Sequence, residues 1–190
     1  MHETRWRAWL TVAALLPALS CGSGRSYQNR NMDFGSIRTI VVMPFWNLSR
    51  ESLAADRVRD VFASSLLATE ATYVVPLGEV GRAISRVGVA NPVSPSADEI
   101  VKIGAMLKAE ALITGVVKEY GEVRTGSAGA NVVSLSAQMF ETTTGKVVWS
   151  GSSTKGGVSF GSRLLGTSGG DPVNDVTEQA VDDLIKQLLR

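Results

Sequence analysis

The chain has 190 residues, of which 44% are hydrophobic and 19% charged, and its formal net charge is +1. This length and apolar content are sufficient for one globular domain with a hydrophobic core. A net charge near zero argues against a nucleic-acid-binding protein, which normally carries a basic surplus. His2 is the only histidine and Cys21 the only cysteine. If residues 1–20 are removed, histidine-based catalysis and ordinary His/Cys metal sites are excluded, and we expect no cofactor.

Residues 1–20 have the layout of a secretory signal. Arg5 and Arg7 precede an apolar run over residues 8–19. As a helix this run rises only about 18 Å, whereas the hydrocarbon core of a bilayer is about 30 Å thick, so the run is too short to span it. A charged start, a short apolar core and a small residue before the cleavage point are typical of a signal peptide. Its removal leaves equal numbers of basic and acidic residues.

The end of this signal, Ala18-Leu19-Ser20-Cys21, resembles the bacterial lipobox, in which the cysteine becomes the acylated first residue. Ala18 stands where a leucine is usual. The alternative is a plain signal peptide that precedes a cysteine, but a lone cysteine in an exported domain would then be a free thiol. The resemblance implies acyl chains such as palmitate on Cys21. Because Gly22 rather than aspartate follows, it also implies sorting to the outer membrane, with the domain facing the periplasm.

Residues 22–36 are polar, contain glycine and serine, and show no apolar period, so they are predicted to form a tether after the lipidated Cys21. The domain is predicted to span residues 37–190. The apolar run 40–45 indicates a strand that is buried on both faces. The next elements are an amphipathic helix over 51–70, a short strand over 73–76, a helix over 77–87, and a helix opened by the capping box Ser96-Ala97-Asp98-Glu99.

The second half of the domain is predicted to be richer in strands. Residues 111–117 form a buried strand that continues to about 123, and residues 132–140 alternate between apolar and polar. After a turn, residues 146–152 return as the partner strand, and residues 121–131 are predicted to be a polar linker. Asp171-Pro172 marks the start of a closing helix, with the aspartate as its cap.

The predicted order is therefore β-α-β-α-α-β-β-β-α. It corresponds to an α/β fold with a mixed sheet, an antiparallel C-terminal hairpin and helices packed on the sheet.

Two strings resemble catalytic motifs, and neither lies in the required context. Gly166-Thr167-Ser168-Gly169-Gly170 matches G-x-S-x-G, but it does not follow a strand that leads directly into a helix, and no histidine can serve as base. Ser152-Ser153-Thr154-Lys155 matches S-x-x-K, but it lies at a strand end rather than a helix start. The sequence therefore predicts that the protein is not an enzyme. A serine hydrolase acting through Ser168 or Ser152 is kept as the third alternative.

Other polar and aromatic candidates have simpler interpretations. The carboxylate pairs Asp98/Glu99 and Asp182/Asp183 are predicted to lie on solvated helix faces, because adjacent helix positions do not face each other. Trp46 and Trp149 each follow an apolar strand run. Both are predicted to be partly buried core residues rather than platforms for a ligand.

Three strings carry a family resemblance. Residues 40–49, IVVMPFWNLS, resemble the IAVLPFxNxS opening of the CsgG-like and TolB amino-terminal-like superfamily. Residues 103–115 are similar to its helix–strand motif, and residues 140–150 to its D..TGKVVW hairpin. The superfamily contains the curli secretion channel, LpoB-type activators of a peptidoglycan synthase, and small uncharacterised outer-membrane lipoproteins. The resemblance implies a TolB-N-like fold with an anticodon-binding-like topology, and a binding or assembly role without catalysis.

The functional prediction combines the lipobox with this resemblance. We expect a lipid-anchored, periplasm-facing binding module in cell-envelope assembly or secretion, and the alternative is an activator of a peptidoglycan synthase. Expected partners are outer-membrane lipid through Cys21, envelope or secretion proteins, and a second copy of the chain in a homo-oligomer.

The predicted partner-binding segment is 156–170, a glycine-rich run that also holds Phe160, Arg163, Leu164 and Leu165. Long loops in compact domains are usually functional or disordered, and contact surfaces favour aromatic residues and arginine. The alternative is that these apolar side chains cover the edge of the sheet.

Overall fold

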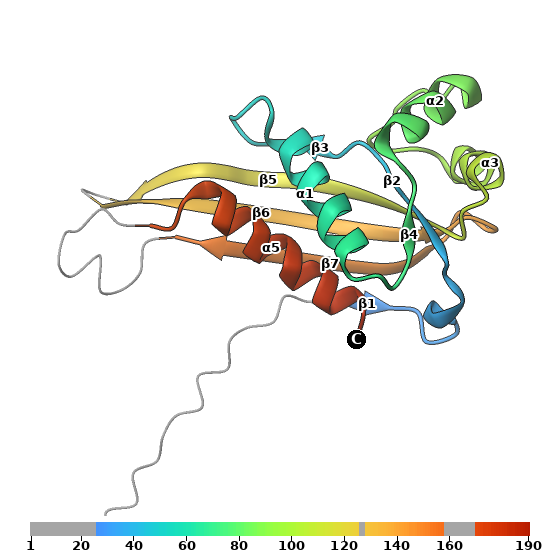
Figure 1. Ribbon diagram of the computed structural model, residues 1–190. Coiled ribbons are helices and arrows are strands. Elements are labelled where there is room, and N and C mark those ends of the chain that lie inside the picture. Colours follow the sequence, from blue (N-terminus) through green and yellow to red (C-terminus); the bar gives the residue numbers. More distant parts are fainter. Residues whose placement is uncertain (1–25, 126–127, 158–169) are drawn as a thin grey trace, which may run out of the picture.

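The computed structural model describes residues 26–125, 128–157 and 170–190 (Figure 1). The strands run over β1 Tyr27–Gln28, β2 Thr39–Val42, β3 Trp46–Asn47, β4 Tyr73–Val74, β5 Ala111–Thr125, β6 Ala128–Glu141 and β7 Val147–Gly156. The α-helices run over α1 Ala54–Ala68, α2 Leu77–Val87, α3 Ala97–Leu107 and α5 Val173–Leu188, and a short 3-10 helix, η1, spans Phe34–Ser36.

One mixed sheet organises the fold. Its strand order is β1-β7-β6-β5-β2-β4, and β3 also pairs with β5. The pairs of β2 with β4, β2 with β5 and β3 with β5 are parallel. The pairs of β5 with β6, β6 with β7 and β7 with β1 are antiparallel. The predicted class, a mixed sheet with an antiparallel C-terminal hairpin and helices packed on it, is confirmed.

The helices divide between the two faces of the sheet. Helices α1 and α5 cover one face of the sheet along the long strands (Figure 1). The main core lies between these two helices and the sheet, and its fully buried side chains include Trp149 of β7, Phe62 of α1 and Leu184 of α5. On the other face, α2 and α3 pack over β2 and the start of β5 through a smaller apolar cluster that includes Val41 and Leu112. Each helix has an apolar stripe of residues at helical spacing, and this stripe packs against the sheet.

The remainder of that second face carries polar side chains. The register pairs Ser136 with Ser152 and Ser134 with Thr154, and the hydroxyl oxygens of Ser134 and Thr154 lie 2.9 Å apart. This alternation of apolar and polar residues along β6 was visible in the sequence, and it is typical of an antiparallel sheet with one covered face.

Helix starts illustrate which local predictions were right. The capping box of α3 is confirmed, because Ser96 Oγ accepts a hydrogen bond from Glu99 N at 3.4 Å while Glu99 Oε2 accepts one from Ser96 N at 2.7 Å. The cap predicted for the last helix is wrong. Pro172 is its N-cap without a side-chain bond. The carbonyl oxygen of Asp171 instead accepts a hydrogen bond from Asn131 Nδ2 at 2.9 Å.

Two segments predicted as connections contain regular structure. Within the predicted tether, Tyr27 pairs with Ser150 of β7, and Asp33 Oδ1 caps η1 by accepting a hydrogen bond from Gly35 N at 3.0 Å. A two-residue edge strand has no apolar period, so the sequence could not reveal it. The predicted linker 121–131 is also mostly strand, since β5 continues to Thr125 and β6 begins at Ala128.

Candidate functional site

The S-x-x-K residues do not converge. Ser152 lies opposite Ser136 on the polar face of the sheet. Lys155 lies three positions further along β7, so its side chain points to the other face, where its Nζ is 3.4 Å from Asp183 Oδ2 of α5. A serine nucleophile and a lysine base on opposite faces cannot act on one substrate atom. Ser168, from the G-x-S-x-G string, lies outside the described residues.

Asp183 is partly buried rather than solvated, which corrects the prediction for this carboxylate. Its Oδ2 accepts hydrogen bonds from Ser153 Oγ at 2.8 Å and from Gln187 Nε2 at 3.3 Å. Burial alone would raise the pKa of Asp183, but the hydrogen bond from Ser153 and the charge of Lys155 outweigh burial and lower it. The group joins β7 to α5, which is a structural role.

The two tryptophans differ sharply in environment. Trp149 is fully buried, so its assignment to the core is confirmed, whereas Trp46 is 49% exposed, so the same assignment is wrong for Trp46. The cause is the neighbouring residue Phe45, which takes the core position. Its ring centroid lies 5.8 Å from that of Phe62, and it packs over Gly115, where an added Cβ would be 2.6 Å from the ring. Successive strand residues alternate in direction, so Trp46 points outward.

Asn47 then fixes the loop that follows Trp46. Its Nδ2 donates to the carbonyl oxygens of Glu51 at 2.8 Å and Ser52 at 3.2 Å. Its Oδ1 accepts from the backbone N and the Oγ of Ser49, at 3.0 and 2.7 Å. The backbone N of Leu48 donates to Val117 O of β5 at 2.8 Å, and the Leu48 side chain is 58% exposed. The PFxNxS string therefore builds a compact turn that holds two large apolar side chains in solvent.

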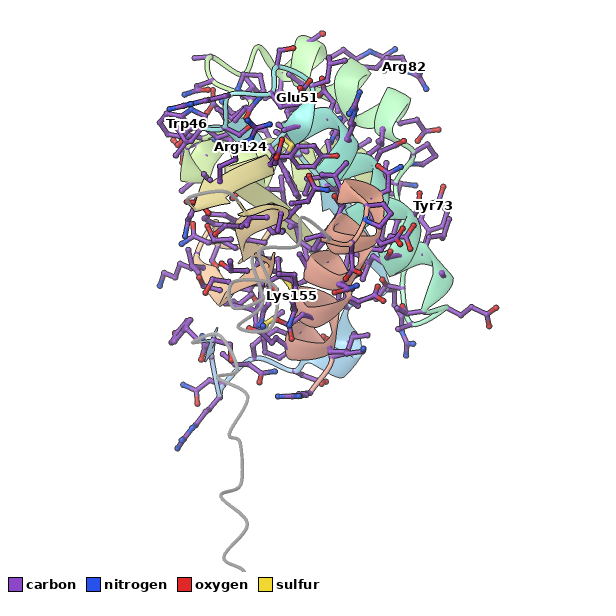
Figure 2. The ribbon with its side chains drawn as sticks, turned by 90° about the vertical axis from the view of Figure 1, so that its left-hand side faces the viewer. Trp46, Glu51, Tyr73, Arg82, Arg124 and Lys155 are labelled. Carbon is purple, nitrogen blue, oxygen red and sulfur yellow. The ribbon has the colours of Figure 1, made fainter. Side chains whose placement is uncertain are left out.

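Leu48 borders a shallow hollow beside β5, and Trp46 lies next to it, opposite Val116 of the same strand. We call this region the Trp46 surface: Trp46, Leu48, Arg50, Lys118, Val123 and Arg124. The hollow has a volume of about 430 Å³ and is lined by the loop 48–50 and by β5 from Lys118 to Arg124. Figure 2 shows Trp46 and Arg124 on the same side of the molecule, away from Tyr73. Arg124 lies 3.0 Å from Glu122, and this contact raises the pKa of the guanidinium.

The outer edge of β5 continues past the hollow. Strand β2 pairs with β5 over Ala111–Ile113 and β3 pairs over Val116–Val117. From residue 119 to residue 125, β5 pairs only with β6 within the part of the chain that the structure describes. A strand edge of this kind offers backbone N–H and C=O groups for pairing with another chain. Apolar side chains, charges and a strand edge thus follow one another along the outer side of β5.

The site residues predicted from sequence all lie outside the described residues, namely Cys21, Gly22, Phe160, Arg163, Leu164 and Leu165. The residues on either side of the loop segment are described. Gly157 N donates to Asn131 O at 2.9 Å, and an added Cβ on Gly170 would be 2.9 Å from Ala130 Cβ. Ala130 is paired with Val123 of the Trp46 surface. Both ends of the predicted partner-binding segment are therefore attached at the end of the β5–β6 hairpin that carries this surface.

Two further results concern the described residues alone. They contain no group of three or more histidine, cysteine, aspartate or glutamate side chains arranged to hold a metal ion. None of the helices described is both long enough and apolar enough to cross a membrane.

This architecture defines a class of small mixed α/β domains that recurs in solved bacterial proteins. A PelC dodecamer from Paraburkholderia phytofirmans matches with a TM-score of 0.59 and 17% identity, over 88% of this chain and 98% of that chain. Lipoprotein GNA1162 from Neisseria meningitidis matches with a TM-score of 0.51 and 24% identity, over 80% and 98%. The LpoB C-terminal domain from Escherichia coli matches with a TM-score of 0.50 and 16% identity, over 66% and 88%.

The sequence comparison goes further than the fold. The family model described as "Putative lipoprotein GNA1162-like" matches residues 31–187, and the chain belongs to this family. No curated protein matches the chain by sequence. A related family of bacterial lipoproteins is thereby confirmed, while the CsgG-like assignment made from the sequence stays a prediction.

Proposed function

We propose that the protein is a lipid-anchored, non-catalytic binding module of the cell envelope that faces the periplasm and acts in envelope assembly or secretion. Membership of a lipoprotein family and the lipobox-like run before Cys21 support the anchor. The observation that carries the binding role is the Trp46 surface. There, an asparagine network holds Trp46 and Leu48 in solvent beside an unpaired stretch of β5.

The chemistry of this surface favours a protein partner. Trp and Arg are the residue types that contribute most to protein interfaces, and they are most effective beside apolar groups that exclude water. A strand edge adds main-chain hydrogen bonds to an extended segment of the partner. The serine-rich face of the sheet and the separated Ser152 and Lys155 give no comparable support to a hydrolase.

Cross-linking in intact envelopes tests the binding role. The double variant Trp46→Ala, Leu48→Ser should lose the cross-linked species formed by the native protein, because it removes the two exposed apolar side chains. Tyr73→Ala is the matched control, since Tyr73 is 56% exposed and lies on the other side of the molecule (Figure 2). Equal loss in both variants, or no loss in the double variant, would contradict the proposal.

The anchor has its own test. Replacement of Cys21 by alanine should release a soluble or unprocessed form, because the thiol is the attachment point for the acyl chains. Two or three such chains, at about 0.8 kcal/mol per buried methylene, anchor a domain stably. Membrane fractionation measures this, and the native chain should fractionate with the outer membrane, as Gly22 predicts. Unchanged membrane association of Cys21→Ala would contradict lipidation.

We further propose that the protein forms a homo-oligomer. A PelC protein of the same fold forms a dodecamer, which supports the idea at the level of architecture alone. Light scattering of the detergent-solubilised native chain measures the oligomeric state, and a strictly monomeric protein would contradict this part.

No separate observation favours the alternative function, in which the protein activates a peptidoglycan synthase. At 16% identity, the similarity to the LpoB domain concerns the fold only.

A further inference from the structure

The edge of the sheet opposite the Trp46 surface is the place where the chain enters the fold. Tyr27 pairs with Ser150 and Gln28 with Trp149, and Asn29 N donates to Val148 O at 2.8 Å. The backbone is therefore attached to β7 from Tyr27 onward, ten positions earlier than the sequence predicted for the start of the domain. This pairing shortens the connection to the anchor.

The length of that connection limits where the domain can sit. Six Cα-to-Cα steps separate Cys21 from Tyr27. A fully extended chain spans about 3.3–3.6 Å per residue, so the anchor and β1 are at most about 22 Å apart. A tether reaching from Cys21 to Ile37 would have allowed more than twice that distance. With an acylated Cys21, strand β1 and the residues around it are the part of the domain that is held next to the bilayer.

The side chains at this edge fit such a position. We call the β1 edge the set Tyr27, Arg30, Phe34, Leu189 and Arg190. Tyr27 is 54% exposed and Leu189 is 50% exposed. Phe34, Leu189 and Arg190 line one hollow of about 310 Å³, and Figure 1 shows β1, η1 and the C-terminal end of α5 along the same side of the molecule. Within residues 26–36 the acidic residue is Asp33, and its carboxylate accepts the hydrogen bond that caps η1.

We propose that the β1 edge rests on the anionic phospholipid surface of the membrane in which Cys21 is anchored, an inference that rests on the proposed lipidation. Exposed tyrosine at the headgroup level and arginine next to anionic lipid are the side chains that membrane interfaces favour. The two arginines match the negative charge of such a surface, and the short connection keeps both within its reach.

The proposal gives the domain an orientation. From β1, the sheet continues through β7, β6 and β5 to β3. Four spacings of about 4.8 Å place Trp46 of β3 about 19 Å further across the sheet than Tyr27. With the β1 edge on the lipid, the Trp46 surface faces away from the bilayer and is accessible to a partner in the periplasm.

Energy transfer to a labelled lipid headgroup tests this orientation. The native, lipidated full chain is reconstituted into phosphatidylethanolamine–phosphatidylglycerol vesicles that carry an acceptor on the headgroup. A donor fluorophore is attached at Asn31→Cys, beside the β1 edge, or at Arg82→Cys on α2, at the far end of the molecule (Figure 2). Both positions are exposed. We expect transfer from position 31 to exceed that from position 82 several-fold.

A charge reversal sharpens the test. The pair Arg30→Glu, Arg190→Glu should lower transfer from position 31, because each arginine near an anionic surface contributes about fivefold to its binding. The matched pair Arg86→Glu, Lys102→Glu, on α2 and α3, should leave it unchanged. Equal transfer from positions 31 and 82 in protein that floats with the vesicles would overturn the orientation while leaving the anchor intact. Failure of the native chain to float with the vesicles would instead overturn the proposed anchor, and the orientation with it.

Discussion

Two tryptophans with similar sequence contexts occupy opposite environments, and the comparison separates stability from binding in this fold. Trp149 lies on β7 under α5 and is fully buried, in contact with the largest apolar cluster. Trp46 lies on β3 at the outer edge of the sheet and is 49% exposed. The surroundings of Trp149 are helices and neighbouring strands, whereas those of Trp46 are a short loop and a strand edge. The first region stabilises the domain, and the second exposes the side chains on which the proposed binding role rests.

The largest expected effect follows directly from this contrast. Trp149→Ala should lower the free energy of unfolding by about 3–5 kcal/mol, because it removes a large side chain and leaves a cavity in the core. Trp46→Ala should cost less than about 1 kcal/mol, as surface substitutions usually do. Denaturant unfolding of the two variants measures both values. Similar losses of stability would show that Trp46 belongs to the core after all.

A smaller effect is expected at Asn47, which contributes to the surface by positioning its neighbours. Asn47→Ala removes four hydrogen bonds within the loop 47–52 and should cost about 1–2 kcal/mol. It should also weaken partner cross-linking, because Leu48 is no longer held in place. Asn29→Ala is a suitable control, since Asn29 Oδ1 accepts a single hydrogen bond from Asn31 N on an exposed loop. If Asn47→Ala changes stability but not cross-linking, the turn does not shape the binding surface.

The smallest effect is expected at Asp183, which joins α5 to β7 in the stabilising region around Trp149. Its pKa is lower in the folded protein than its ordinary value of about 3.9, despite the opposing effect of burial. A carboxyl with a lowered pKa stabilises the folded state at pH values above its ordinary pKa. This stabilisation is lost as the pH falls through the pKa in the folded protein. In Asp183→Asn, the free energy of unfolding should therefore fall less steeply as the pH is lowered. The difference from the native protein should be less than about 1 kcal/mol, because the pair with Lys155 is partly solvated. Thermal unfolding between pH 2 and 7 measures it, and an unchanged slope would contradict the assignment.

The sequence predicted the elements that have a strong internal period or a complete local motif. The helix over 77–87 matches α2 at both ends, and the capping box places the start of α3 correctly. The sequence could not predict β1, because a two-residue strand has no period and depends on pairing with β7, which is far away in the chain. It also missed the extension of β5 and β6 into the predicted linker, where polar side chains on exposed strand edges resemble those of a loop.

The candidate site was harder to predict than the fold. The exposure of Trp46 depends on Phe45 filling the space over Gly115, a contact between residues 70 positions apart. One signal was present in the sequence. In an extended segment such as Phe45-Trp46-Asn47, which enters β3, successive side chains point in opposite directions, so a core position for Phe45 turns Trp46 outward.

Site-specific photo-cross-linking in intact cells tests the central claim most directly. A photoreactive amino acid is introduced at Leu48, in the Trp46 surface, or at Leu67 on the outer side of α1, two leucines with similar exposures of 58% and 52%. The account predicts a discrete protein adduct from position 48 that disappears when Trp46 is also replaced by alanine, and no such adduct from position 67. An adduct from position 67 alone, or adducts from both positions that do not depend on Trp46, would contradict it.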